Sequence, residues 1–241
     1  MSWFVFALIF LAQPDHALDC FQRANAAYEA GRFDEAVRLY DSTLLGAQSP
    51  TVYYNRGNAH FRANRVGLAI ADYLRAWRLA PRDPDINFNL NFARQFRVDR
   101  NPNPEGIWSR FVRAIFTVFN PPVTRVITAL IFFLSALFLA GYFLRHRSAL
   151  LIIGLVLTVL FLFGLGSVWY WRGATDRNLA VVVVPEAIVR AGPGSEYREI
   201  AAVHDGLEVK IIEHRPEWVL IQIPGGLGGW IERSALERVF Q

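Results

Sequence analysis

Two long apolar runs without a charged residue constrain this chain of 241 residues more than any other feature. The first covers residues 126–144 and the second covers residues 148–171, with only Arg145, His146 and Arg147 between them. A helix rises 1.5 Å per residue, so about 20 residues cross a hydrocarbon core of about 30 Å. We therefore predict two transmembrane helices, over 123–144 and 148–171, joined as a hairpin.

The charged residues indicate which partners to expect. Residues 17–105 contain 12 Arg against 10 Asp and Glu, and residues 177–241 contain 7 Lys and Arg against 9 Asp and Glu. Neither part forms a basic patch, so the composition argues against nucleic acid as a partner. The excess positive charge flanks the apolar runs and suits anionic lipid headgroups of a bilayer. It consists of Arg110, Arg113, Arg125, Arg145, Arg147 and Arg172.

The N-terminus resembles an export signal. Residues 3–12 are apolar, too few to span a membrane and typical of the core of a signal peptide, so we assign 1–17 as a signal-like segment, cleaved or retained. The single cysteine, Cys20, excludes an intrachain disulfide. The preceding Asp19 argues against lipidation of this cysteine and favours a buried thiol on a helix.

The same features predict an orientation. Short loops rich in arginine stay in the cytoplasm, and the loop 145–147 is the shortest and most positively charged connection. We therefore expect a two-pass protein of the bacterial inner membrane, with both large soluble parts in the periplasm.

Residues 18–97 are expected to form a helical domain built from an internal repeat with a period of 33 residues. Breaks fall at 46–50 and 81–84, and a third unit that begins at Asp85 is expected to close the domain. The matched positions resemble the tetratricopeptide repeat, with departures at Arg56 and Thr43. The aligned pairs are Ala24 with Gly57, Gly31 with Asn64, Ala36 with Ala69, and Tyr40 with Tyr73.

Close packing explains this pattern of small residues. We expect Gly57 on one helix to face Ala69 on the next, because only small side chains allow two helices to approach closely. Gly31 and Asn64 are expected in left-handed conformations at the turns between helices.

The resemblance to tetratricopeptide proteins also implies a peptide-binding groove, lined by the first helix of each repeat. Asn25 and Asn58 offer amide donors and acceptors for a peptide backbone, and Arg62 suits a partner segment with an acidic end. The alternative is that these are ordinary solvated helix positions. The candidates are Phe21, Asn25, Glu29, Tyr54, Asn58 and Arg62.

Residues 98–122 connect the helical domain to the membrane. After a polar linker, residues 107–119 have an amphipathic pattern. The pattern fits either an interfacial helix or an extension of the first membrane helix that is broken at Pro121 and Pro122.

From residue 177 the pattern changes to short strands with glycine turns, which predicts a small all-β barrel over 177–241. Five strands are expected, over 179–184, 207–212, 218–223, 228–231 and 234–239, and residues 187–194 lead into a turn. The sequence Val189-Arg190-Ala191-Gly192-Pro193, Gly206, Trp218 and Gly229-Trp230-Ile231 resembles the bacterial SH3 domain. That resemblance implies a ligand surface with Tyr197, Trp218 and Trp230 as candidates, although Trp230 suits the barrel core better.

No catalytic motif is recognised in the sequence. The five histidines lack metal-ligand spacing, and no nucleophile elbow or Walker loop is present. We therefore expect no enzyme activity, no cofactor and no metal.

The predicted fold class is multidomain: an all-α helical repeat, a two-helix transmembrane hairpin and an all-β SH3-like barrel. This order resembles the BatE family of the bacterial aerotolerance operon. The resemblance implies a periplasm-facing scaffold in an envelope stress complex that binds other envelope or membrane proteins. The alternative is a cell-wall factor that binds peptidoglycan through its SH3-type domain.

Overall fold

The computed structural model describes residues 13–45, 48–99 and 106–240. The chain forms two compact units, one made of residues 1–104 with 177–241 and the other of residues 105–176. Residues 1–12, which hold most of the predicted export segment, lie outside the described residues, and the chain is helical from Gln13. The two segments that were expected to form separate soluble domains thus belong to one compact unit.

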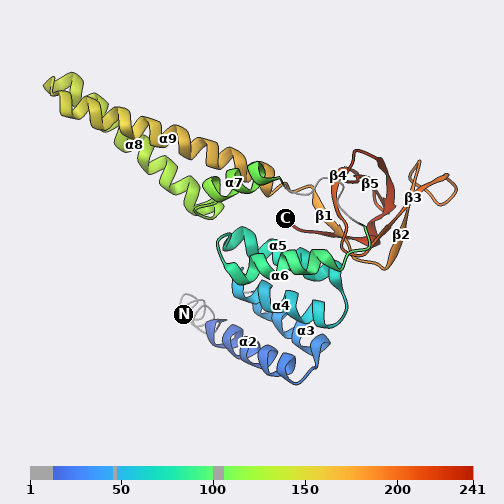
Figure 1. The fold of residues 1–241 in the computed structure, drawn as a ribbon. Coiled ribbons are helices and arrows are strands. Elements are labelled where there is room, and N and C mark those ends of the chain that lie inside the picture. Colours follow the sequence, from blue (N-terminus) through green and yellow to red (C-terminus); the bar gives the residue numbers. More distant parts are fainter. Residues whose placement is uncertain (1–12, 46–47, 100–105, 241) are drawn as a thin grey trace, which may run out of the picture. The chain divides into compact units, whose positions relative to one another are not determined.

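Five helices stack as antiparallel neighbours in the N-terminal part of the first unit (Figure 1). They have the expected repeat geometry, because Gly31 and Asn64 end corresponding helices with φ of +75° and +60°. The predicted all-α tetratricopeptide-like fold of this region is confirmed. The helices are α2 (Gln13–Glu29), α3 (Phe33–Leu44), α4 (Pro50–Arg62), α5 (Val66–Leu79) and α6 (Pro84–Gln95).

Gly57 makes a close contact with an aromatic ring of the next helix. A Cβ atom built on Gly57 would lie 2.7 Å from the ring of Tyr73, which provides all three of its nearest atoms. Tyr73 is 2% exposed and fills the space between α4 and α5. The small residue at position 57 therefore accommodates an aromatic ring.

The C-terminal part of the first unit is one antiparallel sheet of seven strands in the order β3-β2-β6-β5-β4-β1-β7. The SH3-like all-β class is confirmed, but the prediction of five strands is wrong because the β2–β3 hairpin was read as a turn region. A short 3-10 turn, Arg233–Ala235, precedes the last strand. The strands are β1 (Leu179–Val182), β2 (Glu186–Arg190), β3 (Glu199–His204), β4 (Glu208–His214), β5 (Trp218–Gln222), β6 (Gly228–Glu232) and β7 (Leu236–Arg238).

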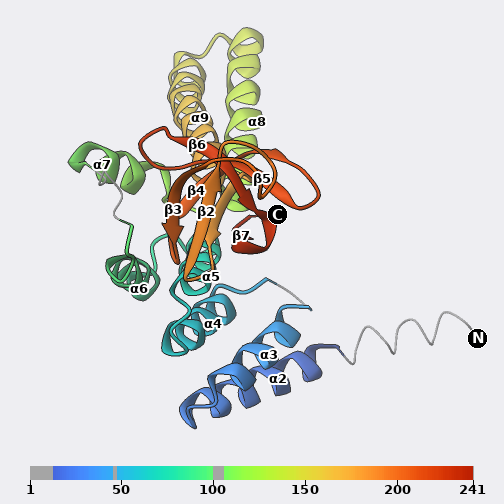
Figure 2. The same ribbon diagram turned by 90° about the vertical axis from the view of Figure 1, so that its right-hand side faces the viewer.

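The β domain covers the apolar surface that the helical repeats leave open. Ile70 and Leu74 on α5 and Leu90 on α6 share one buried cluster with Val181 of β1 and with Phe240. Both views show the sheet beside α5 (Figure 2). The expected closing helix α6 therefore shares this role with the β domain. Burial of this kind contributes roughly 25 cal/mol per Å² of apolar surface.

The second unit contains α7 (Ile107–Phe116), α8 (Pro121–Arg145) and α9 (Ser148–Ala174). α8 and α9 are long and apolar enough to cross a membrane, judged by length and composition. Ser135 on α8 donates to the carbonyl of Gly154 at 3.1 Å and lies 2.8 Å from the hydroxyl of Thr158. Small and hydroxyl-bearing residues bring helices together where a bilayer offers no hydrophobic driving force.

α7 is a separate helix, because Thr117 ends it and the side chain of Asn120 accepts from the N–H of Val123 to begin α8. Its C-terminal end packs on α9, where Ser167 donates to the carbonyl of Phe116 at 2.5 Å. Its other end exposes Ile107 and Trp108. The structure therefore favours a distinct amphipathic helix over an extension of the first membrane helix.

Candidate functional site

Asn25 and Asn58 occupy the same position in successive repeats and make the same contact. The hydroxyl of Tyr40 donates to Oδ1 of Asn25 at 2.7 Å, and the hydroxyl of Tyr73 donates to Oδ1 of Asn58 at 2.8 Å. Burial raises the pKa of Tyr40 to about 12, so its hydroxyl stays protonated and remains a donor. The 33-residue period thus places two tyrosine-held amides on the first helices of the repeats.

A second donor approaches each of these oxygens from the first helix of the following unit, which is α4 for Asn25 and α6 for Asn58. Nδ2 of Asn55 donates to Asn25 Oδ1 at 3.2 Å, and Nδ2 of Asn89 donates to Asn58 Oδ1 at 2.9 Å. Two donors on one oxygen determine the orientation of the amide. Among the described residues, Nδ2 of Asn25 has no hydrogen-bond acceptor and is available as a donor, whereas the amide of Asn58 also bonds to the side chain of Tyr54.

A cavity of about 260 Å³ lies at these amides. Of the six predicted groove residues, it brings together Asn25, Glu29 and Asn58. Its further residues Tyr28, Tyr40 and Asn55 were not predicted as ligand contacts. The complete lining is Asn25, Tyr28, Glu29, Tyr40, Asn55 and Asn58.

The other three predicted groove residues lie outside this lining. Tyr54 accepts from Asn89 at 3.0 Å, and the ring of Phe21 packs 6.1 Å from that of Tyr40. The guanidinium of Arg62 lies over the ring of Phe33, 5.3 Å from its centroid. With Arg62 outside the lining, Glu29 is the one charged side chain of the cavity lining. Its carboxylate favours a partner segment with a basic side chain over one with an acidic end.

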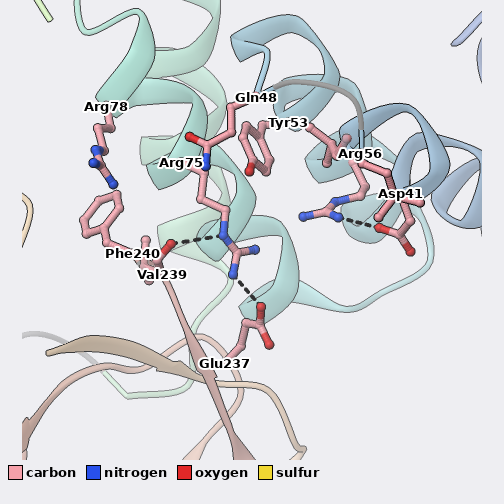
Figure 3. Close-up of a pocket in the computed structure, with 11 residues that line it drawn as sticks. Asp41, Gln48, Tyr53, Arg56, Arg75, Arg78, Glu237, Val239 and Phe240 are labelled. Carbon is pink, nitrogen blue, oxygen red and sulfur yellow. Dashed lines mark hydrogen bonds and ion pairs between the residues drawn. The ribbon is translucent and has the colours of Figure 1, made fainter. Parts of the chain in front are cut away.

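A network of charges joins the repeats to the β domain (Figure 3). Arg56 donates twice to Asp72, at 2.7 and 2.5 Å, and also pairs with Asp41. Arg75 donates to the same Asp72 at 2.8 Å and pairs with Glu237. Asp72 is 1% exposed, so this carboxylate is buried between two guanidinium groups.

This network explains why Arg56 departs from the tetratricopeptide pattern, which expects a large apolar residue there. The arginine compensates the buried charge of Asp72, and through Arg75 that charge is linked to the last strand. Arg75 also donates to the carbonyl of Val239 at 3.1 Å. Thr43, the second departure, bonds to the carbonyl of Leu39 at 3.0 Å within its own helix.

A cavity of about 420 Å³ opens beside the network. Figure 3 shows Arg75 between Gln48 and Glu237, with Tyr53 beside it. Its arginines are already held: Arg56 and Arg75 by carboxylates, and Arg78 over the ring of Phe240 at 5.3 Å. We therefore interpret this cavity as part of the seam between repeats and sheet.

Two further contacts close that seam. Glu208 at the start of β4 accepts from Arg94 at 2.8 Å on each oxygen, and Arg97 adds a third bond at 3.1 Å. Asp99 accepts from the N–H of His204 at 2.6 Å. The bidentate geometry specifies how α6 sits against the sheet.

The three predicted aromatic residues of the β domain are not brought together. Tyr197 is 44% exposed, and its ring covers the backbone of Gly192. Trp230 is 8% exposed beneath the guanidinium of Arg215, 4.6 Å from the ring centroid. Trp218 is half-buried and lines a hollow of about 640 Å³ that holds neither of the other two. The hollow is lined by Pro216, Glu217, Trp218, Glu232, Arg233 and Ser234.

Comparison with protein families agrees with this architecture. The tetratricopeptide repeat family matches residues 21–84, and the bacterial SH3 domain family matches residues 185–237. The protein therefore contains two kinds of binding module together with two apolar helices. No curated protein matches the chain. In the described parts of the chain, no group of three or more His, Cys, Asp or Glu side chains is placed to hold a metal ion.

Proposed function

We propose that this protein is a membrane-anchored, non-catalytic scaffold that binds an extended segment of another protein in the cavity between α2 and α4. The observation that carries the proposal is the repeated amide pair. Asn25 and Asn58 each have the oxygen occupied by a tyrosine and a second asparagine, and Asn25 retains a free NH₂ group at the cavity.

The chemistry of the cavity indicates what kind of segment fits. An amide donor that is open to the cavity, such as that of Asn25, suits a backbone carbonyl of an extended peptide. Glu29 provides a carboxylate for a lysine or arginine side chain of that peptide. We therefore propose a partner segment with a basic residue.

The resemblance to the BatE family supports an envelope setting, in which the scaffold belongs to a stress or aerotolerance complex. The bacterial SH3 match and the arginine-rich loop 145–147 support a two-pass inner-membrane protein with its first unit in the periplasm. A fusion of alkaline phosphatase after Gln241 should be active. If the fusion after Gln241 is inactive and a fusion at His146 is active, the protein has the opposite orientation.

The groove is tested by reversing its charge. A photo-crosslinking residue in place of the exposed Arg62, which lies one helical turn after Asn58, should capture the partner in the native membrane. Adding Glu29→Lys should abolish the crosslink. The control is Glu186→Lys, the same change at an exposed position of β2. If Glu29→Lys and Glu186→Lys give equal crosslinking, the cavity is not the binding surface.

The second candidate function is attachment to peptidoglycan, and the hollow at Trp218 favours it. Because the β domain packs on the repeats, the test uses the full chain in detergent with purified peptidoglycan. Retention that is lost in Trp218→Ala would support this function. If the unmodified protein and Trp218→Ala both remain in the unbound fraction, the protein does not bind peptidoglycan, and the groove stays the proposed binding site.

A further inference from the structure

Three exposed phenylalanine rings and a fourth that is half-buried form a continuous patch on the first unit. Phe88, Phe92 and Phe96 follow each other at intervals of four on α6, and Phe61 of α4 contacts the last two at centroid distances of 5.7 and 5.2 Å. Phe88 is 67% exposed, Phe92 39% and Phe96 56%. A contiguous aromatic surface of this kind normally marks a binding site. We call it the α6 aromatic patch.

The first unit is tied to the apolar hairpin by two short connections. Four residues separate the end of α9 at Ala174 from β1 at Leu179, a reach of about 18 Å when fully extended. The other connection starts at Asp99, which is bonded to His204 of the sheet. From Asp99 to Ile107 at the start of α7 the chain reaches about 29 Å when fully extended. A unit of this size has a radius of gyration of about 15 Å, so both tethers are too short to hold it far from a bilayer.

The patch is the apolar surface next to one of these tethers. Phe96 lies three residues before Asp99, and the stripe from Phe88 to Phe96 is about 12 Å long. The chain then continues into α7, whose exposed Ile107 and Trp108 are typical of a helix in the membrane interface. Trp169 on α9 is 77% exposed and belongs to the aromatic residues expected at that level.

We infer that the α6 aromatic patch rests on the lipid surface of the membrane that holds the hairpin. This inference depends on the membrane anchoring proposed above. The rings would enter the headgroup and acyl boundary, and the contact would keep the groove of the repeats at a defined height above the bilayer.

The test is spin labelling of the full chain in vesicles of phosphatidylcholine and phosphatidylglycerol. In a Cys20→Ala background, single cysteines replace Phe92, Leu155 of α9 or Leu45, which is 90% exposed directly after α3. Relaxation by oxygen reports lipid and relaxation by a water-soluble nickel complex reports solvent. Phe88→Cys is a second label in the patch, should Phe92→Cys not fold.

We expect the label in the patch to show a ratio of oxygen relaxation to nickel relaxation that is close to the ratio at position 155 and higher than the ratio at position 45. A patch label that matches position 45 overturns it and leaves the anchoring intact. A label shielded from both reagents overturns it in favour of a protein partner. If position 155 is itself accessible to nickel, the membrane anchoring fails as well.

Discussion

Oδ1 of Asp205, in the turn between β3 and β4, lies 3.0 Å from the backbone nitrogen of Gly67 in the first turn of α5. Arg65 at the N-cap position of α5 makes no side-chain capping bond. The first turn of a helix has N–H groups without partners inside the helix, so a residue 138 positions away provides the cap. A Cβ atom at Gly67 would overlap the carbonyl oxygen of Val182, so glycine permits this approach.

The Asp205 cap predicts that Asp205→Ala weakens the start of α5. Loss of a cap costs roughly 0.5–2 kcal/mol, which corresponds to about a twofold to thirtyfold loss of hydrogen-exchange protection at 66–69 when exchange follows local opening. Asp205→Asn is the control, because its amide oxygen still accepts. Equal exchange in Asp205→Ala and the unmodified protein would show that this contact does not hold the helix.

The charge network predicts that Arg56→Leu is destabilising, although it restores the apolar residue of the repeat pattern. Asp72 would keep Arg75 as its one guanidinium partner, and breaking a buried ion pair costs about 3 kcal/mol. The measurement is urea unfolding of the full chain in detergent.

The control for this prediction is the double variant Arg56→Leu with Asp72→Asn, which removes the buried charge together with its partner. It should recover part of the stability. If the single and double variants unfold at the same urea concentration, the cost lies in packing rather than in the uncompensated carboxylate.

His60 predicts a dependence of stability on acid pH. Its pKa is lowered to about 4, chiefly by burial and also by the nearby Arg65 and Arg56, although Asp72, 3.8 Å away, acts in the opposite direction. In the unfolded chain the histidine has its ordinary pKa of 6.5. The contribution of neutral His60 to the free energy of unfolding is therefore complete above pH 6.5 and is lost as the pH falls towards 4. The loss amounts to about 3 kcal/mol. Unfolding of His60→Leu should lack this component, and an identical pH profile would contradict the assignment.

Gly57 predicts an overpacking defect. Gly57→Leu would force the ring of Tyr73 away and break its bond to Asn58, at a cost of roughly 1–3 kcal/mol or more. Thermal unfolding of the full chain should shift to lower temperature. The matched substitution Ala63→Leu, at the end of the same helix, should shift it less. An unchanged melting temperature in Gly57→Leu would mean that the register of the repeat is wrong.

The local patterns in the sequence account for much of the architecture. The 33-residue period predicted the left-handed turns at Gly31 and Asn64 and the equivalence of Asn25 and Asn58, because these depend on neighbouring turns and on helix faces. The uncharged runs predicted α8 and α9 from length alone. The β2–β3 hairpin was missed because Glu199, Ala201 and Ala202 give β3 a weak alternation of apolar and polar residues.

Sequence alone therefore determined the fold class of each segment and, apart from β2 and β3, the order of the elements, since these are encoded by spacing within some 30 residues. The tertiary structure decided how they combine. Asp72 with Arg56 and Arg75, Asp205 with Gly67, and Glu208 with Arg94 join residues whose pairing leaves no local pattern. The free amide hydrogens of Asn25 also became apparent only from its partners, because an amide side chain is the same in sequence whichever of its atoms is occupied.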